Sequence, residues 1–204
     1  MEKCVITIAR GFGSGGRTIG KLLAQRLDID YYNDDLIKLA SEESGINLEL
    51  FGKADERVKV NLFKRYKRSY GEWTIPPDSD MFVSDDNLFN YQAKIIRDLA
   101  DKQSCIIIGR CANHVLQEAG VHCFNVFCYG SRKARMAHAA ELNEARDMDL
   151  AKYIDMRDTH RNNFYRTFVG TDLDDCRQYN LCLDTGVISP DLCADIIVSI
   201  IEKL

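Results

Sequence analysis

The sequence lacks the features of a membrane protein, a disulfide-rich secreted protein or a zinc protein. No apolar run is long enough to span a bilayer, and the N-terminus turns polar too soon for a signal peptide. The eight cysteines show no CxxC spacing, and no His/Cys cluster has the spacing of a zinc site. We therefore expect free thiols in a reducing cytoplasm, most of them buried in apolar runs. The cysteines in such runs are Cys4, Cys105, Cys123, Cys128 and Cys182.

The chain also has few prolines and no excess of positive charge. Only three prolines occur in 204 residues, and two of them are adjacent, Pro76 and Pro77. The net charge of −4 gives no general attraction to nucleic acid, so an anion site must be local. The basic run 64–68 is better explained as a solvated helix face than as a nucleic-acid patch. A hydrophobic fraction of 46% and a length of 204 residues fit one folded domain.

Short apolar runs alternate with helical patterns along the chain. The expected strands are 4–9, 30–32, 105–109, 123–129 and 179–185. The expected helices are 16–27, 35–44, 87–102, 132–142, 150–164 and a last one that Ser189 caps and Pro190 begins. Strands separated by helices predict an α/β fold, with a five-stranded parallel sheet and helices on both faces. The charged stretch 50–85 is interpreted as an insertion.

Polar and glycine-rich segments follow the expected strands, where ligands of such sheets bind. The glycine cluster follows the first strand, and Asp34 follows the second. The third strand ends at Gly109 and Arg110, and the fourth ends at Tyr129. Because the carboxyl ends of parallel strands meet at one edge, we expect these segments to converge on a single site.

The glycine cluster at residues 11–18 reads GFGSGGRT and fits the P-loop pattern GxxxxGK[ST], with arginine in place of lysine. Its glycines let backbone N–H groups point at phosphate oxygens, and the helix that begins near Gly16 adds its positive dipole end. Thr18 is placed to hold Mg²⁺ through its hydroxyl. Arg17 suits bidentate phosphate contact, so we expect phosphate binding to survive the loss of lysine.

The same residues also spell the dinucleotide-binding pattern GxGxxG, through Gly11, Gly13 and Gly16. Asp34 follows at about the spacing that this pattern requires. Three observations favour the P-loop: Arg17 and Thr18 stand where it needs a cation and a hydroxyl, the chain is short for a dehydrogenase, and the later arginines suit polyphosphate. A glycine turn without a ligand is a third interpretation, and so many glycines in one turn argue against it.

Taken in order, these motifs resemble the cytidylate kinase-like family, relatives of the bacterial CMP kinases. The matching segments are ITIARGFGSGGRTIGKLLAQRL, YYNDDLI, CIIIGRCANHVL, RDTHRNNFY and YNLCLDT. They follow the family order over nearly the whole chain, and the stretch from about 50 to 85 matches poorly. The lysine of the loop is replaced by Arg17, and Cys111 stands where CMP kinases have an acid after Gly-Arg.

The resemblance implies a single domain, 1–204, with a three-layer P-loop kinase fold, an acceptor-binding region at 33–104 and a small helical lid at 131–165. It implies ATP and Mg²⁺ as cofactors, and a nucleotide or another small phosphate acceptor as partner. The residues implied for the ATP phosphates are Gly11, Gly13, Ser14, Gly15, Gly16, Arg17, Thr18, Arg132 and Arg135. Those implied for the acceptor are Asp34, Arg110, Asp158 and Arg161. Those implied for catalysis are Arg17, Arg110, Arg157, Asp158 and Arg161.

The residues support some of these roles on their own. Arg157 and Arg161 are four apart and share a helix face, and Asp158 is three residues before Arg161. The alternative for the Asp158–Arg161 pair is a surface ion pair of little energy. Arg110 ends a buried strand at the ligand edge, which favours a functional role. For Asp34 the alternative is a helix cap. The four histidines show no triad spacing and are interpreted as structural or exposed.

Three functions follow from these patterns. The leading hypothesis is an ATP-dependent phosphotransferase in the cytoplasm, acting on a nucleoside monophosphate such as CMP or dCMP. Arg17 and Cys111 motivate the second, a catalytically weak nucleotide-binding regulatory protein. The GxGxxG spelling motivates the third, a dinucleotide-binding protein.

Overall fold

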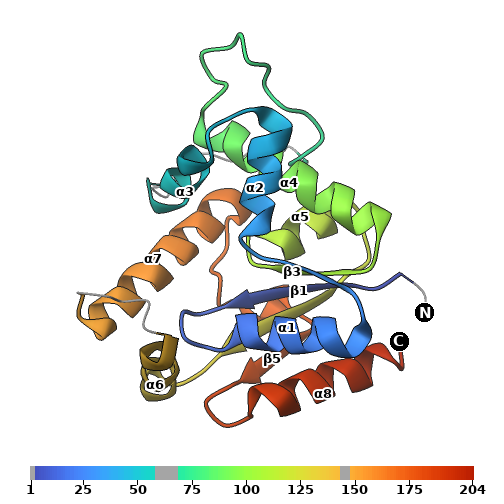
Figure 1. Cartoon of the computed structure of the whole chain (residues 1–204), viewed down its shortest axis with the longest axis vertical. Helices are drawn as coiled ribbons and strands as arrows, with labels where there is room; N and C mark the ends of the chain where they lie inside the picture. The colour runs from blue at the N-terminus through green and yellow to red at the C-terminus, as the bar shows by residue number, and fades with distance from the viewer. Residues whose placement is uncertain (1–2, 58–68, 143–147) are drawn as a thin grey trace.

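A computed structural model of the chain describes residues 3–57, 69–142 and 148–204, so the basic run 64–68 lies outside the described residues. Five strands form one parallel sheet in the order β2-β3-β1-β4-β5 (Figure 1). The strands are β1 (Val5–Arg10), β2 (Asp30–Tyr32), β3 (Cys105–Ile108), β4 (Phe124–Tyr129) and β5 (Leu181–Asp184). The predicted five-stranded parallel sheet is confirmed, and β1, with the glycine loop at its end, lies in the centre.

The helices of the described residues include every helix that the sequence predicts. They are α1 (Gly16–Leu27), α2 (Asp35–Ser44), α3 (Leu48–Arg57), α4 (Asp85–Lys102), α5 (Ala112–Glu118), α6 (Arg132–Leu142), α7 (Leu150–Val169) and α8 (Pro190–Ile201). Helix α3 falls in the stretch interpreted as an insertion, and α7 runs to Val169, beyond the expected end at 164. None of the described helices combines the length and the apolar character of a bilayer-spanning segment.

Two hydrophobic cores lie on opposite faces of the sheet because strand side chains alternate. Ile6 and Ile8 of β1 face one core, which α1 and α8 cover (Figure 1). Val5 faces the other core, where it packs with residues of α2, α4, α5 and α7. The predicted three layers, a sheet with helices on both faces, are confirmed.

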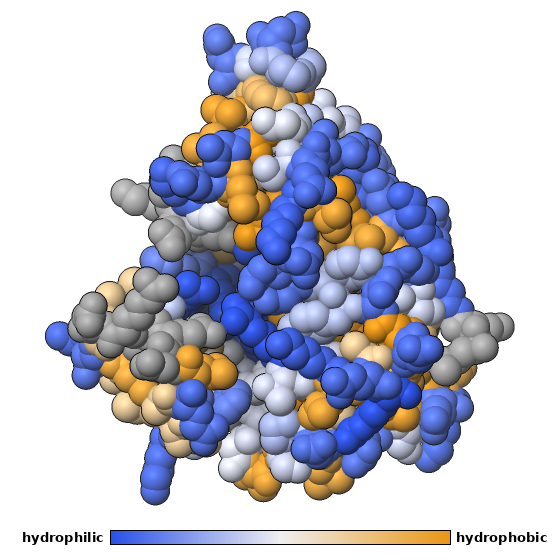
Figure 2. All heavy atoms as spheres, in the orientation of Figure 1, coloured by the Kyte–Doolittle hydropathy of each residue, from blue (hydrophilic) through white to orange (hydrophobic). Residues whose placement is uncertain are grey.

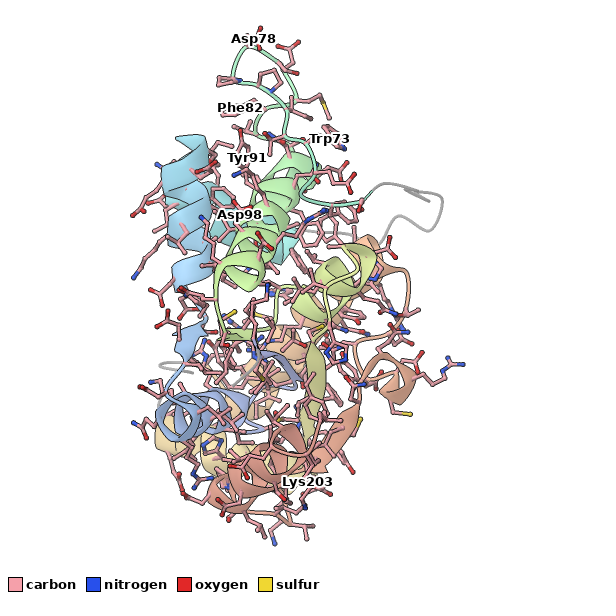
Figure 3. The ribbon with its side chains drawn as sticks, turned by 90° about the vertical axis from the view of Figure 1, so that its right-hand side faces the viewer. Trp73, Asp78, Phe82, Tyr91, Asp98 and Lys203 are labelled. Carbon is pink, nitrogen blue, oxygen red and sulfur yellow. The ribbon has the colours of Figure 1, made fainter. Side chains whose placement is uncertain are left out.

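The loop that precedes α4 projects away from the sheet. Figure 3 shows Trp73, Asp78 and Phe82 on this projection. Asn87, fully buried at the start of α4, holds its base: its side chain accepts from the amide of Ile75 at 2.7 Å and donates to the carbonyls of Ile75 and Phe82. One buried side-chain amide therefore joins two points of the loop to the start of α4.

All eight cysteines lie in the described part of the chain and are free thiols. Of the five expected in buried runs, Cys105 and Cys128 are buried, and Cys4, Cys123 and Cys182 are half-buried. Burial raises the pKa of Cys105 and of Cys128 to about 12, so these thiols stay protonated and unreactive at neutral pH.

Candidate active site

The glycine loop connects β1 to α1 and is fastened to the neighbouring strand. The amide of Gly11 donates to the carbonyl of Cys128 on β4 at 3.2 Å. The Ser14 hydroxyl shares its hydrogen between the carbonyl of Gly11 in the loop, at 2.8 Å, and the carbonyl of Cys128 on β4, at 2.9 Å. Gly13 and Gly15 have φ of 75° and 70°, where a side chain would be strained. Ser14, predicted at the ATP phosphates, therefore shapes the loop through its side chain.

The loop lines a cavity of about 180 Å³, which we call the loop cavity. Gly15, the N-cap of α1, makes no side-chain cap hydrogen bond, and the start of the helix presents backbone N–H donors and its positive dipole end to this cavity. The exposed Thr18 lines the same cavity. These donors fit the phosphates of ATP, and a hydroxyl beside phosphate oxygens fits Mg²⁺, which takes oxygen ligands mainly from water and phosphates. The remaining members of the lining include Lys21, His138 and Leu142.

A second set of residues comes from the turn between β3 and α5. Gly109, Arg110 and Cys111 are consecutive and all left-handed, with φ of 72°, 57° and 54°. For a non-glycine residue this conformation costs about 1–2 kcal/mol. Backbone strain of this kind is held at sites where the surrounding structure requires it. The turn brings Arg110 and Cys111 to the wall of a larger cavity.

The larger cavity, of about 290 Å³, is strongly cationic, and we call it the arginine cavity. Its arginines are Arg10, Arg17, Arg110, Arg157 and Arg161, and its carboxylate is Asp34. The Oδ1 atom of Asp34 lies 3.9 Å from Nη2 of Arg17, and Asp34 makes no side-chain cap hydrogen bond to α2. Figure 2 shows hydrophilic surface around a hollow between the α2 and α7 sides of the molecule. The cavity suits a ligand with several negative charges.

Arg10, Arg17 and Arg161 line both cavities, so the two cavities meet at these three residues. Arg161 donates to the carbonyl of Arg10 at 3.5 Å. Burial, together with the positive charge of Arg157 and other neighbours, lowers the pKa of Arg161 to about 10. Sequence analysis missed Arg10, although a charged residue at the end of a buried strand was the signal that identified Arg110.

Asp158 and Arg135 lie against the glycine loop rather than in either cavity. The amide of Phe12 donates to Oδ1 of Asp158 at 2.7 Å, and Arg135 donates to the carbonyl of Phe12 at 3.1 Å. Arg135 and Asp158 also form an ion pair with each other. The two predicted residues therefore hold α6 and α7 against the loop through its second residue.

The ring of Phe12 packs between the same two helices. Phe12 is 4% exposed and forms a small core with Ala139 and Ile154. Its ring meets the ring of Tyr153 edge-on, with centroids 5.2 Å apart. The guanidinium of Arg161 lies over the Phe12 ring at 5.4 Å, within cation–π range. The loop, the α6–α7 pair and the shared arginines thus form one connected unit.

Arg132 lies apart from both cavities, and two of the histidines line them. Arg132, expected at the ATP phosphates, forms a bidentate pair with the exposed Asp155 at 2.7 and 2.8 Å, and lines neither cavity. His138, interpreted as structural or exposed, lines the loop cavity, and its Nδ1 lies 3.0 Å from the carbonyl of Gly13. His160 lines the arginine cavity.

Comparison with known proteins agrees with this architecture. Residues 5–187 match the cytidylate kinase-like family. A protein of Thermoplasma volcanium named cytidylate kinase is 21% identical over 203 residues, 98% of this chain and 92% of that protein. A solved structure, an uncharacterized protein from Eubacterium ventriosum, is 22% identical, has a TM-score of 0.67 and aligns over 99% of this chain and 100% of that one. Shikimate kinase from Bacteroides thetaiotaomicron shares the fold, with a TM-score of 0.59 at 11% identity over 98% of both chains. The chain therefore belongs to the cytidylate kinase-like family and is a P-loop kinase.

Proposed function

We propose that this kinase transfers the γ-phosphoryl group of ATP to the phosphate of a nucleoside monophosphate, with CMP or dCMP as the leading acceptor. The observation that carries the proposal is the meeting of two cavities at Arg10, Arg17 and Arg161. One cavity has the backbone donors of a phosphate loop, and the other is lined by arginines. Two phosphate-bearing substrates would meet where the cavities join.

On the ATP side, the glycine loop and the start of α1 bind the phosphates. The amides of the first helical turn donate to phosphate oxygens, and Lys21 lies on the same lining. Thr18 would hold Mg²⁺, which neutralises phosphate charge when bound. The family and the fold favour this interpretation of GFGSGGRT over the dinucleotide one.

On the acceptor side, charge favours a phosphate over an alcohol. A hydroxyl acceptor needs a base to remove its proton, whereas a phosphate acceptor carries its own nucleophilic oxygen anion. The arginine cavity holds five arginines and the carboxylate of Asp34, which is already 3.9 Å from Arg17. Arg110 and Arg157 line this cavity and not the loop cavity, so we propose that they bind the acceptor phosphate.

The lid segment, residues 131–165, would control access to the junction. Its helices contact the loop through Phe12, Arg135 and Asp158. Closure over the phosphates excludes water, which would otherwise hydrolyse ATP. Opening would break the contacts at Phe12 and release the products.

The test is an acceptor screen that measures ADP release with ATP, Mg²⁺ and each of the common ribo- and deoxyribonucleoside monophosphates. We expect CMP or dCMP to give the highest kcat/KM. Purified, folded protein that releases no ADP with any of these acceptors contradicts the proposal.

A catalytically weak regulatory protein is the second candidate, and the proximity of Arg17 to Asp34 favours it, since a carboxylate can draw the loop cation away from ATP. Arg17→Lys separates the two. If the wild type binds ATP without turnover and Arg17→Lys turns over, the regulatory function is supported. If the wild type turns over and Arg17→Lys is no faster, the kinase proposal stands.

A further inference from the structure

Arg10, the last residue of β1, lies between the two cavities. Its Nε is fully buried and has no hydrogen-bond partner among the described residues. Its Nη2 donates to Oδ1 of Asn33, a neutral group, at 3.4 Å. Gly109 makes room for the guanidinium, since a Cβ there would lie 1.9 Å from Nη1 of Arg10. The guanidinium is therefore held in one direction, with its Nε shielded from solvent.

The surroundings of Arg10 leave its charge uncompensated. Burial lowers its pKa well below the usual range, and the neighbouring cations Arg161, Arg17 and Arg110 lower it further. No carboxylate pairs with Arg10 within 3–57, 69–142 and 148–204. A buried charge without a partner is costly, and this cost is offset when an anion binds beside it. Fixed cations at a ligand junction are the arrangement that stabilises charge in a transition state.

We propose that Arg10 is a catalytic residue that binds the transferring phosphoryl group between the two substrates. This inference rests on the proposed function. In the transfer, the bond between the γ-phosphorus and the β,γ-bridging oxygen breaks, and a bond from an acceptor phosphate oxygen to the γ-phosphorus forms. ADP leaves with the bond's electron pair. Arg10 keeps its protons and donates hydrogen bonds to the oxygens of the moving group.

Arg10 and Arg17 would divide the work of the missing loop lysine. The side chain of Arg17 is 37% exposed and lies 3.9 Å from Asp34, so water and a carboxylate screen the electric field of its charge at the junction. Arg10 has no carboxylate beside it within the described residues and its Nε is buried, so its field at the junction is screened less. A residue that acts mainly on the moving group changes kcat more than KM, because its contact is made in the transition state.

The first experiment compares Arg10→Ala and Arg10→Lys with the wild type in the ADP-release assay, with ATP, Mg²⁺ and CMP. We expect kcat to fall about 100-fold to 1,000-fold for Arg10→Ala, as for loss of one transition-state donor. We expect the KM values to change by less than about 10-fold, and free methylguanidinium to restore part of kcat in Arg10→Ala. The control is Arg177→Ala, since Arg177 is 84% exposed and pairs with Asp175 outside both cavities.

A second variant moves Arg10 without removing its charge. Gly109→Ala places a Cβ against Nη1 of Arg10. The matched control is Gly120→Ala, because Gly120 has a similar φ of 69° with nothing within 4 Å of its Cβ, so only backbone strain is added. We expect kcat to fall in Gly109→Ala and to stay near wild type in Gly120→Ala. An equal kcat in all variants, or a loss in Arg10→Ala that methylguanidinium does not reverse, overturns the inference.

A binding experiment separates this inference from the proposed function. Calorimetry with inorganic pyrophosphate needs no turnover and no known acceptor. We expect Arg10→Ala to bind pyrophosphate about 3-fold to 10-fold more weakly than the wild type, a smaller loss than in kcat, and Arg177→Ala to bind it equally. If no acceptor is phosphorylated but Arg10→Ala binds pyrophosphate more weakly than the wild type, the proposed function fails. The assignment of Arg10 as the residue that binds phosphate at the junction then still holds. If Arg10→Ala binds pyrophosphate as the wild type does, the inference fails whatever the kinase assay gives.

Discussion

Oδ1 of Asp158, on α7, accepts a hydrogen bond from the backbone amide of Phe12 at 2.7 Å. The carbonyl of the same residue accepts from Arg135 of α6 at 3.1 Å, and Arg135 pairs with Asp158. Both backbone polar groups of Phe12 are therefore satisfied by the two helices of the lid segment. The phosphate loop and the lid segment would respond together to nucleotide binding.

Asp158→Ala should weaken ATP binding and loosen α7. The substitution removes a charge-assisted hydrogen bond worth about 1.5–3 kcal/mol and leaves the Phe12 amide and Arg135 without their partner. The thermal midpoint and the KM for ATP report the two effects. Asp155→Ala is the control, because Asp155 lies on the same helix as Asp158 but pairs with Arg132 of α6 at an exposed position, where solvent screens the ion pair. Equal effects of both substitutions would contradict the role of Asp158.

Phe12→Ala should detach the lid segment from the loop. The ring is 4% exposed and packs on Tyr153, Ala139 and Ile154, and removing a buried Phe costs about 3–5 kcal/mol. We expect faster proteolysis within α6 and α7 and more ATP hydrolysis per phosphorylated acceptor, because water reaches the junction. Phe12→Leu keeps most of the apolar volume, so it should keep the lid segment attached to the glycine loop. Unchanged proteolysis in Phe12→Ala would show that the ring does not hold the lid segment.

The five parallel strands and most of the helices were predictable because local patterns determine them, whereas α3, α5 and the order of the strands in the sheet were not predicted. Short apolar runs ending in glycine mark buried parallel strands, and the glycine spacing identifies the loop whatever the packing around it. The roles of Arg10, Phe12 and Arg132 could not be predicted from local patterns. Their roles depend on which side chain lies opposite, and those partners are more than 20 residues away: Asn33 for Arg10, Asp158 for Phe12 and Asp155 for Arg132. Only tertiary structure brings such pairs together.

Gly13→Ala should lower the free energy of unfolding more than Gly45→Ala does. Gly13 has φ of 75°, and a Cβ there would lie 2.4 Å from the backbone oxygen of Arg135, an atom that cannot move alone. Gly45 has a nearly equal φ of 73° with nothing within 4 Å, so Gly45→Ala measures the strain of the backbone alone, about 1–2 kcal/mol. We expect Gly13→Ala to add about 1–3 kcal/mol for overpacking. Urea unfolding of both variants checks this, and equal losses would contradict it.

Protonation of His114 should lower the free energy of unfolding as the pH falls below neutral. Burial lowers the pKa of His114, and Glu118 offsets only part of the effect. The neutral ring is therefore favoured in the folded chain, and the unfolded chain binds the proton more readily below its pKa of about 6.5. The contribution of His114 to the free energy of unfolding is therefore complete above the pKa of the unfolded chain. It is lost as the pH falls through the lower pKa that His114 has in the folded chain. His114→Gln should reduce the drop in thermal midpoint between pH 7.5 and 5.5, with His122→Gln, at an exposed position, as the control. An equal drop in wild type and His114→Gln would contradict the role of His114.

Multivalent anions should stabilise the protein more than chloride at equal ionic strength. Arg10 and Arg161 are buried beside further arginines, and burial, together with the repulsion between these charges, lowers the pKa of Arg161 to about 10. An anion that binds the folded chain at 100 times its dissociation constant adds about 2.7 kcal/mol. For a chain of this size that raises the thermal midpoint by about 5–11 °C, at 2–4 °C per kcal/mol. Chloride only screens, so it should raise the midpoint far less. The rise with pyrophosphate should shrink in Arg161→Ala and persist in Arg177→Ala. An equal response to chloride and pyrophosphate would mean that general screening, and not a built phosphate site, relieves the repulsion.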